Sequence, residues 1–468
     1  MMKPVFLGKY LLAACWCAAF PAAEAGAGTA QLHPASGDSL PSLCRVLDRG
    51  PVLYRDDSSW IRRVKLTLIG QYQTAAVSPN GANKFCPSSG GHNSEWRRAY
   101  LGGDVVMGDG SWRLSNLTNV GDLEGRHREV RGEWTGSRTE WSLYELYLEK
   151  TMPGIKFRAG KLTPHLTSEY CLASSRIKTV ERSALCNELI PISNWGLEAN
   201  FQKDARSLYH SYGVYLNANG TDLKDEIQFH SADNLFALNA MKWKVASPMW
   251  DSQTLGYQYA HNFTEWRGRK VPSSSDYCGT GAQDVISLSW DASRGAFSVM
   301  GNLLAGVGIV GQPGAKNVYG LVLQPVYRIS PHLEGVFQYQ CSFGNRSVKL
   351  NTRYVPSVTH YPAWVDSMHS FYLGLNCYLC PEAVNAVKLM LAVEYVPSRV
   401  DSTTARAFNG WSVFGAVRFK FCSPPAAIAV SSAQLAGKRG APEWERIRGG
   451  AGPTRDAWAG CPLQKWLH

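Results

Sequence analysis

Basic side chains recur at every second position in several segments of the chain. Arg63 and Lys65 alternate with apolar residues, and Arg418 and Lys420 do the same near the far end. A guanidinium offers a planar fork of N–H donors and an ammonium offers a point charge, so rings of such groups can replace the hydration shell of a small anion. The positions on polar faces that are predicted to carry an anion pathway are Arg63, Lys65, Arg98, Lys156, Arg158, Lys388, Arg418 and Lys420.

Acidic residues share the same polar faces. They are Asp104, Glu145, Glu149, Glu334 and Glu394. Eight basic and five acidic side chains could also form salt bridges along the wall of a water-filled lumen. Basic side chains near strand ends can in addition reach lipid headgroups. Two interpretations therefore stay open, an anion filter and an ordinary hydrated wall.

The residues around these charges alternate with a period of two, which indicates half-buried β-strands. Val64, Leu66 and Leu68 share one face of the first segment, and the intervening residues are polar. Segments of this kind have roughly the length of a tilted membrane strand. Sixteen of them are predicted to begin near Trp60, Trp96, Ser111, Thr139, Gly154, Ser193, His210, Leu235, Trp250, Ala282, Gly295, Lys316, Pro331, His369, Asn385 and Gly410.

The connections between these segments alternate between short and long. The short ones, such as 108–110 and 152–154, are built from Gly, Pro and Asp and have the chemistry of tight turns. The long ones include 77–95, 121–138, 162–192, 262–281 and 341–368. Short turns at one rim, long loops at the other and Trp residues at strand ends are typical of outer-membrane barrels. The predicted fold is all-β, a closed antiparallel transmembrane β-barrel of about 16 strands over residues 60–421.

Three stretches resemble the phosphate-selective porin O and P family. They are 96–102 with its Arg-Arg-Ala sequence, 144–164 with a Pro-Gly turn, and 174–187. The resemblance covers residues 60–421 and implies a sixteen-stranded trimeric channel for phosphate-like anions, whose third long loop folds inward and narrows the pore. On this resemblance, 162–192 is the constriction loop. The candidates added for the anion pathway are Lys161, Arg176, Lys178 and Arg182.

The two ends of the chain carry separate signals. Residues 1–25 have a basic start, an apolar stretch and a small-x-small cleavage site, which indicates a secretory signal peptide and hence export to the bacterial outer membrane. A lipid anchor at Cys15 is the alternative. Residues 26–59 are predicted to form a linker segment. Residues 422–468 follow Phe421, where such barrels usually end, and are interpreted as a periplasmic extension or the product of an altered reading frame.

Ten of the 12 cysteines remain once the signal peptide is removed. Cys171 and Cys186 are spaced to close one loop, and Cys377 and Cys380 form a C-x-x-C pair whose alternatives are a turn disulfide or two thiols. A zinc site would need a second pair at metal spacing, which the sequence lacks. No metal or cofactor is therefore predicted.

A net charge of +11 favours anionic partners. Nucleic-acid motifs and common catalytic motifs are absent from the sequence, so no nucleic-acid partner and no enzyme activity are predicted. A lipase on the barrel surface, with a Ser and a His as its reacting groups, is a remote alternative. The prediction is a homotrimeric porin in outer-membrane lipid that passively conducts small anions such as phosphate or polyphosphate. The alternatives are a general-diffusion or sugar-conducting porin, and a surface adhesin or structural barrel.

Overall fold

The computed structural model describes most of the central part of the chain. The described residues are 52–79, 91–120, 128–130, 133–135, 142–190, 193–202, 208–216, 235–263, 282–309, 317–349, 364–399 and 408–421. The predicted signal peptide and the tail 422–468 lie outside these residues, as do residues 26–51 of the predicted linker.

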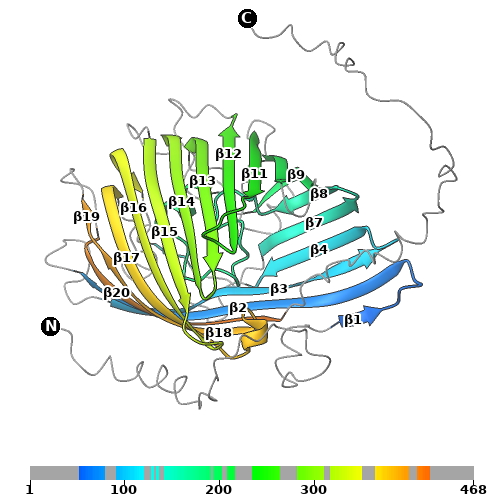
Figure 1. The fold of residues 1–468 in the computed structure, drawn as a ribbon, viewed down its shortest axis with the longest axis horizontal. Coiled ribbons are helices and arrows are strands. Elements are labelled where there is room, and N and C mark those ends of the chain that lie inside the picture. Colours follow the sequence, from blue (N-terminus) through cyan, green and yellow to red (C-terminus); the bar gives the residue numbers. More distant parts are fainter. Residues whose placement is uncertain are drawn as a thin grey trace, which may run out of the picture. The chain divides into compact units, whose positions relative to one another are not determined.

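Sixteen long strands follow one another round one antiparallel sheet (Figure 1). β20 returns to pair with β2, from Phe421 opposite Leu68 to Gly410 opposite Pro79, so the sheet closes into a barrel. In ring order the strands are β2 (Ile61–Pro79), β3 (Gly91–Met107), β4 (Trp112–Asn119), β7 (Ser142–Met152), β8 (Ile155–Leu162), β9 (Asn194–Gln202), β10 (Leu208–Leu216), β11 (Leu235–Lys244), β12 (Ser252–Asn262), β13 (Ala282–Arg294), β14 (Phe297–Ile309), β15 (Asn317–Arg328), β16 (Leu333–Lys349), β17 (Trp364–Tyr378), β18 (Val387–Val396) and β20 (Gly410–Phe421).

The remaining described elements are small. β1 (Val52–Arg55), which falls in the predicted linker, pairs with β2, and β19 (Ser398–Arg399) pairs with β17. β5 (Arg128–Val130) and β6 (Glu133–Thr135) form a separate hairpin between β4 and β7. The two helices of the described residues are α3 (Ala184–Leu189) and the 3-10 turn η1 (Pro381–Ala383). Within the described ranges, no helix is long and apolar enough to cross a membrane.

The sixteen predicted strands are confirmed. The largest differences lie at β3, which begins at Gly91 instead of Trp96, and at β17, which begins at Trp364 instead of His369. The alternation of connection length is also confirmed by the strand bounds: residues 153–154 separate β7 from β8, whereas 163–193 separate β8 from β9. Gly154 has a φ of +77°, a conformation that glycine adopts without strain in such a tight turn.

The two faces of the wall are the reverse of those in a water-soluble protein. Large apolar side chains such as Leu197, Leu303 and Leu373 are more than half exposed. Polar side chains such as Gln258 and Gln338 are fully buried on the opposite face. An apolar outer face suits lipid and a polar inner face suits a water-filled lumen. We call the buried face the lumen wall.

Charged and apolar side chains separate onto opposite faces of the last two strands. Lys388 and Glu394 on β18 and Arg418 on β20 are buried on the lumen wall. Trp411 and Val417 on β20 are exposed on the outer face. Because side chains alternate along a strand, one exposed apolar residue fixes the direction of its neighbours.

Candidate functional site

The segment 163–193 between β8 and β9, here the β8–β9 loop, contacts lumen-wall side chains from strands far apart in the sequence. Within it, residues 175–181 lie along β16, β17, β18, β20, β2 and β3, and we call them the strap. Helix α3 follows the strap and contacts a different part of the wall. The loop is therefore held on two sides.

Helix α3 is held by apolar packing. Leu185 and Leu189 are almost fully buried in a cluster with lumen-wall residues of β10 to β15. A Cβ atom at Gly306 would lie 2.5 Å from Leu189 Cδ2, and one at Gly320 would lie 2.4 Å from Leu185 Cδ2. Two glycines on β14 and β15 therefore make room for the helix, because any larger residue would meet the two leucines.

The strap is held chiefly by its backbone carbonyl groups. Arg418 donates to the carbonyls of Ile177 at 3.1 Å and Val180 at 2.9 Å. Lys388 donates to the Ile177 carbonyl at 2.7 Å and to the Ser175 carbonyl at 3.4 Å. These two strand residues are direct partners in the β18–β20 register. Two buried basic groups thus find their acceptors on the loop, since a buried donor without an acceptor is costly.

Contacts from β16 and β17 fix the middle of the strap. Lys178 Nζ lies 2.7 Å from Glu334 Oε2 and 3.1 Å from the Tyr378 hydroxyl. Asn376 donates to the Lys178 carbonyl at 2.9 Å. The Val180 side chain is fully buried in an apolar cluster of the wall that includes Tyr372. Polar and apolar contacts together therefore leave this part of the strap closely attached.

Glu181, the last residue of the strap, is bound by Arg97 and Arg98, and we call these three residues the clasp. Arg98 donates from Nη1 to Oε1 and from Nη2 to Oε2, both at 2.9 Å, and Arg97 Nε donates to Oε1 at 2.9 Å. Burial by itself raises the pKa of Glu181, but the charges of Arg97 and Arg98 outweigh that effect and hold the pKa well below its usual range. Glu181 is therefore ionised at neutral pH.

A β-bulge brings two consecutive arginines to the same carboxylate. In the β2–β3 register Gln71 opposes Arg98 and Tyr72 opposes Trp96, so Arg97 is the extra residue. A bulge re-aims one side chain out of the strict alternation of a strand. Alternation alone would direct Arg97 to the outer face, and it was therefore missing from the residues predicted for the anion pathway.

The other predicted loop residues lie elsewhere. Arg182 is buried and donates to the carbonyls of Glu169 at 3.1 Å and Leu172 at 3.0 Å. Its guanidinium lies 4.1 Å from the ring centre of Tyr170. Arg176 is exposed on the strap. Arg182 thus stabilises the loop from within, whereas Arg176 is in contact with water.

A second group of predicted residues lies on β8. Lys156 Nζ is 3.5 Å from Glu149, and Arg158 is paired with Glu198 on β9. Lys156 and Arg158 line a cavity of about 310 Å³ together with His165. Burial and then the charge of Arg158 lower the pKa of His165 to about 4, although its side chain keeps 29% of its exposure. His165 therefore carries no charge near neutral pH.

The remaining predicted wall residues lie on β2, β8 and β20. Lys65 on β2 is buried and opposes Asp104 on β3, which accepts from Arg113 at 2.6 Å. Lys161 is buried at the end of β8. The structure gathers Arg98, Lys178, Lys388 and Arg418 around the strap and leaves Arg63, Lys65, Lys156, Arg158, Lys161 and Lys420 at other places on the wall.

Neither predicted cysteine pairing is formed, which corrects that expectation. Cys171 and Cys186 are free thiols: Cys171 Sγ lies 3.7 Å from the His165 carbonyl, and Cys186 Sγ lies 2.8 Å from Thr167 Oγ1. Cys377 keeps its thiol, and Cys380 is disulfide-bonded to a cysteine other than Cys377. Cys380 lies after the end of β17 and packs against Ala383 of η1.

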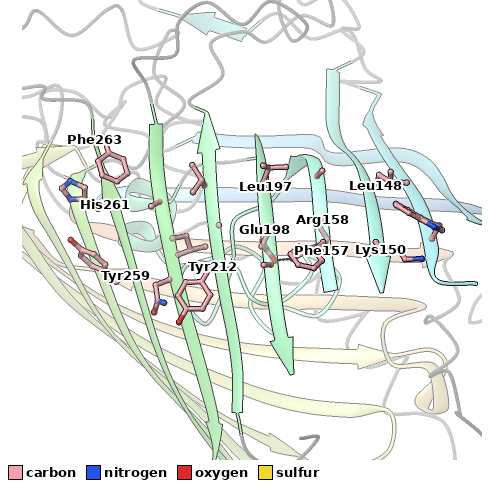
Figure 2. A pocket seen from close by; sticks show the side chains of 18 residues that line it. Leu148, Lys150, Phe157, Arg158, Leu197, Glu198, Tyr212, Tyr259, His261 and Phe263 are labelled. Atoms are coloured by element: carbon pink, nitrogen blue, oxygen red, sulfur yellow. Dashed lines mark hydrogen bonds and ion pairs between the residues drawn. The ribbon is translucent and has the colours of Figure 1, made fainter. Parts of the chain in front are cut away.

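One cavity lies on the outer face. Figure 2 shows Phe157, Leu197 and Tyr212 along neighbouring strands at this cavity of about 910 Å³. These side chains are 43–66% exposed and lie on the apolar side of β8, β9 and β10. The cavity is therefore a groove in the lipid-facing surface. Among the described residues, no cluster of three or more His, Cys, Asp or Glu could hold a metal ion.

No protein-family model and no curated protein matches the sequence. Among solved structures, OprB of Pseudomonas putida at high pH matches with a TM-score of 0.51 and 9% identity, over 76% of this chain and 94% of that chain. The outer-membrane channel DcaP of Acinetobacter baumannii matches with a TM-score of 0.47 and 10% identity, over 80% and 99%. An anion-selective porin from Comamonas acidovorans matches with a TM-score of 0.47 and 11% identity, over 76% and 99%. The chain thus has the fold of an outer-membrane porin, and its apolar outer face places it in the bacterial outer membrane.

Proposed function

We propose that the barrel passively conducts small anions, phosphate or polyphosphate in particular, and that the β8–β9 loop forms the constriction. One observation carries the proposal. Within the described residues, five basic side chains gather around the strap, Arg97, Arg98, Lys178, Lys388 and Arg418, against two carboxylates, Glu181 and Glu334.

Such a surplus of basic groups attracts anions into a narrow aqueous passage. Low-dielectric walls focus the field of fixed charges, and rings of Arg and Lys make an anion-selective pore. Arg97 gives the cluster contact with water, since 47% of its side chain is exposed while Arg98 keeps 7%. An anion in the lumen therefore meets Arg97 first.

The resemblance to the phosphate-selective porin family supports the choice of phosphate over other anions. Two of the three resembling stretches, 96–102 and 174–187, contain the Arg97–Arg98 pair and Glu181, which meet in the clasp. From the sequence pattern we also propose that residues 1–25 direct export and that the barrel spans 60–421 between a linker and a tail. The resemblance supports the proposal that three copies assemble.

The reversal potential of the purified protein in planar bilayers under a salt gradient tests this function. We expect a reversal potential close to the equilibrium potential of the anion. We also expect the chloride current to fall when phosphate is added. Arg98→Gln should shift the potential toward zero, whereas Arg294→Gln, at the exposed end of β13, should leave it unchanged. A potential near zero in the unmodified protein would instead indicate a general-diffusion pore.

A further inference from the structure

We propose that Glu181 is a tethered competitor of the permeating anion: its carboxylate occupies the oxyanion position between Arg97 and Arg98, and a solute must displace it to bind there. The inference rests on the proposed function and deepens it. It makes Glu181 the residue that sets which anions pass, although Glu181 is itself negatively charged and would ordinarily be counted against anion transport.

The geometry of the clasp is that of a bound ligand. Arg98 meets Glu181 fork to fork with two parallel hydrogen bonds of 2.9 Å, and Arg97 adds a third to Oε1. Guanidinium groups bind carboxylate and phosphate in this same bidentate way. A phosphate oxygen pair can therefore take the two positions that Oε1 and Oε2 occupy.

The charges favour replacement by a dianion. Arg97, Arg98 and Arg418 all act on the single negative charge of Glu181. A phosphate group carries about 1.5 to 2 negative charges at neutral pH and offers three acceptor oxygens. It therefore matches three guanidinium groups better than one carboxylate does, whereas chloride, with one charge and no pair of fixed acceptors, does not.

The rest of the strap does not depend on the clasp. Arg418 and Lys388 bind backbone carbonyls of Ser175, Ile177 and Val180, and Lys178 binds Glu334. None of these contacts uses the Glu181 side chain. The carboxylate can consequently swing away from the arginines while the strap stays on the wall. Phosphate would therefore displace the Glu181 carboxylate and bind the arginines, whereas chloride would not displace it.

The experiment compares Glu181→Gln with Glu334→Gln in planar bilayers, using the full chain. Both substitutions remove a buried carboxylate that holds the strap, but only the first removes the competitor. For Glu181→Gln we expect a chloride conductance several times that of the unmodified protein. We also expect the phosphate concentration that halves the chloride current to fall about tenfold, as the loss of one charged competitor implies. Glu334→Gln also removes one negative charge from the constriction but leaves the position between Arg97 and Arg98 filled, so we expect a smaller rise in chloride conductance and much less change in that phosphate concentration.

Three results would overturn the inference. They are an unchanged phosphate block in Glu181→Gln, equal effects in the two variants, and a reversal potential near zero in Glu181→Gln, which would show a loosened loop. Glu181→Asp, which keeps the charge on a shorter side chain, should give an intermediate block and serves if the Gln variant does not fold. A reversal potential near zero in the unmodified protein would instead contradict the proposed function itself.

Discussion

Two parts of the lumen wall are polar in different ways. On β2, β3, β18 and β20 the wall carries Gln71, Arg98, Lys388 and Arg418, and we call this part the basic wall. On β12, β13 and β14 it carries Gln258, Ser287 and Asn302, here the neutral wall, where the Ser287 hydroxyl lies 2.7 Å from Gln258 Oε1 and 2.8 Å from Asn302 Oδ1.

The difference lies in where each part finds its partners. The neutral wall joins its amides and hydroxyl across adjacent strands. The basic wall uses carbonyl and carboxylate groups of the strap, because buried cations need acceptors of their own. The channel should therefore discriminate between anions and cations at the basic wall, where the strap binds, and not at the neutral wall. The predictions below test this difference between the two walls.

Arg98→Ala should have the largest effect. It leaves Glu181 buried with Arg97 as its remaining clasp partner, and breaking a buried ion pair costs about 3–5 kcal/mol. We expect the free energy of unfolding to fall by that amount and the reversal potential to shift toward zero. Urea titration in detergent and bilayer recordings measure the two. A variant as stable as the unmodified protein would show that the clasp does not hold the loop.

Leu189→Ala should come next. The side chain of Leu189 is fully buried beside Gly306, and a truncation of this kind costs about 3 kcal/mol. The same urea titration measures it, with Leu303→Ala on the outer face of β14 as the control. The reversal potential should stay unchanged, since the packing contacts of Leu189 are apolar. A shift in selectivity would break the proposed division between the two sides of the loop.

Acid should weaken the clasp gradually. The pKa of Glu181 is lower in the folded protein than in the unfolded chain. Its ionisation therefore stabilises the fold above about pH 4.3, the ordinary pKa of a glutamate. This stabilisation is lost as the pH falls toward the pKa of the folded state. The difference in unfolding free energy between the unmodified protein and Glu181→Gln should be constant from pH 8 to about pH 5 and shrink below about pH 4. A difference that does not change with pH would contradict the buried ion pair.

Ser287→Ala should have the smallest effect. It removes the hydroxyl between two amides of the neutral wall and should lower the free energy of unfolding by about 1 kcal/mol. Anion selectivity should remain that of the unmodified protein in the same bilayer recordings. A change in reversal potential comparable to that of Arg98→Ala would contradict the assignment of charge discrimination to the basic wall.

The barrel could be predicted because its signals are local. Alternation along one segment is enough to assign Lys388 and Arg418 to the lumen and Val417 to the outer face, and turn residues such as Gly154 mark where a strand must reverse. These patterns need no knowledge of which segments meet in space.

The site could be predicted only in part. Alternation and residue type predict Arg98, Lys388 and Arg418, and the resemblance of the long loop predicts Lys178. No local pattern fixes the path of the loop that brings them together. Arg97 was missed because a bulge is set by the pairing of two strands and is not visible in one of them.

The cysteine expectation was wrong for a related reason. Sequence spacing says how long a closed loop would be, whereas a disulfide requires two Cβ atoms that approach and face each other. Cys171 and Cys186 lie in the same loop but contact different partners, the His165 carbonyl and the Thr167 hydroxyl.

The anchors of the strap also impose an order on folding. Arg98 precedes Glu181 by 83 positions, whereas Arg418 follows Ile177 by 241. Contacts between positions so distant in sequence form late, because the chain between them must first be placed. β20 is also the strand that closes the ring onto β2. The strap can thus reach its full set of partners only in a barrel that has closed, and a docked strap marks a completed pore.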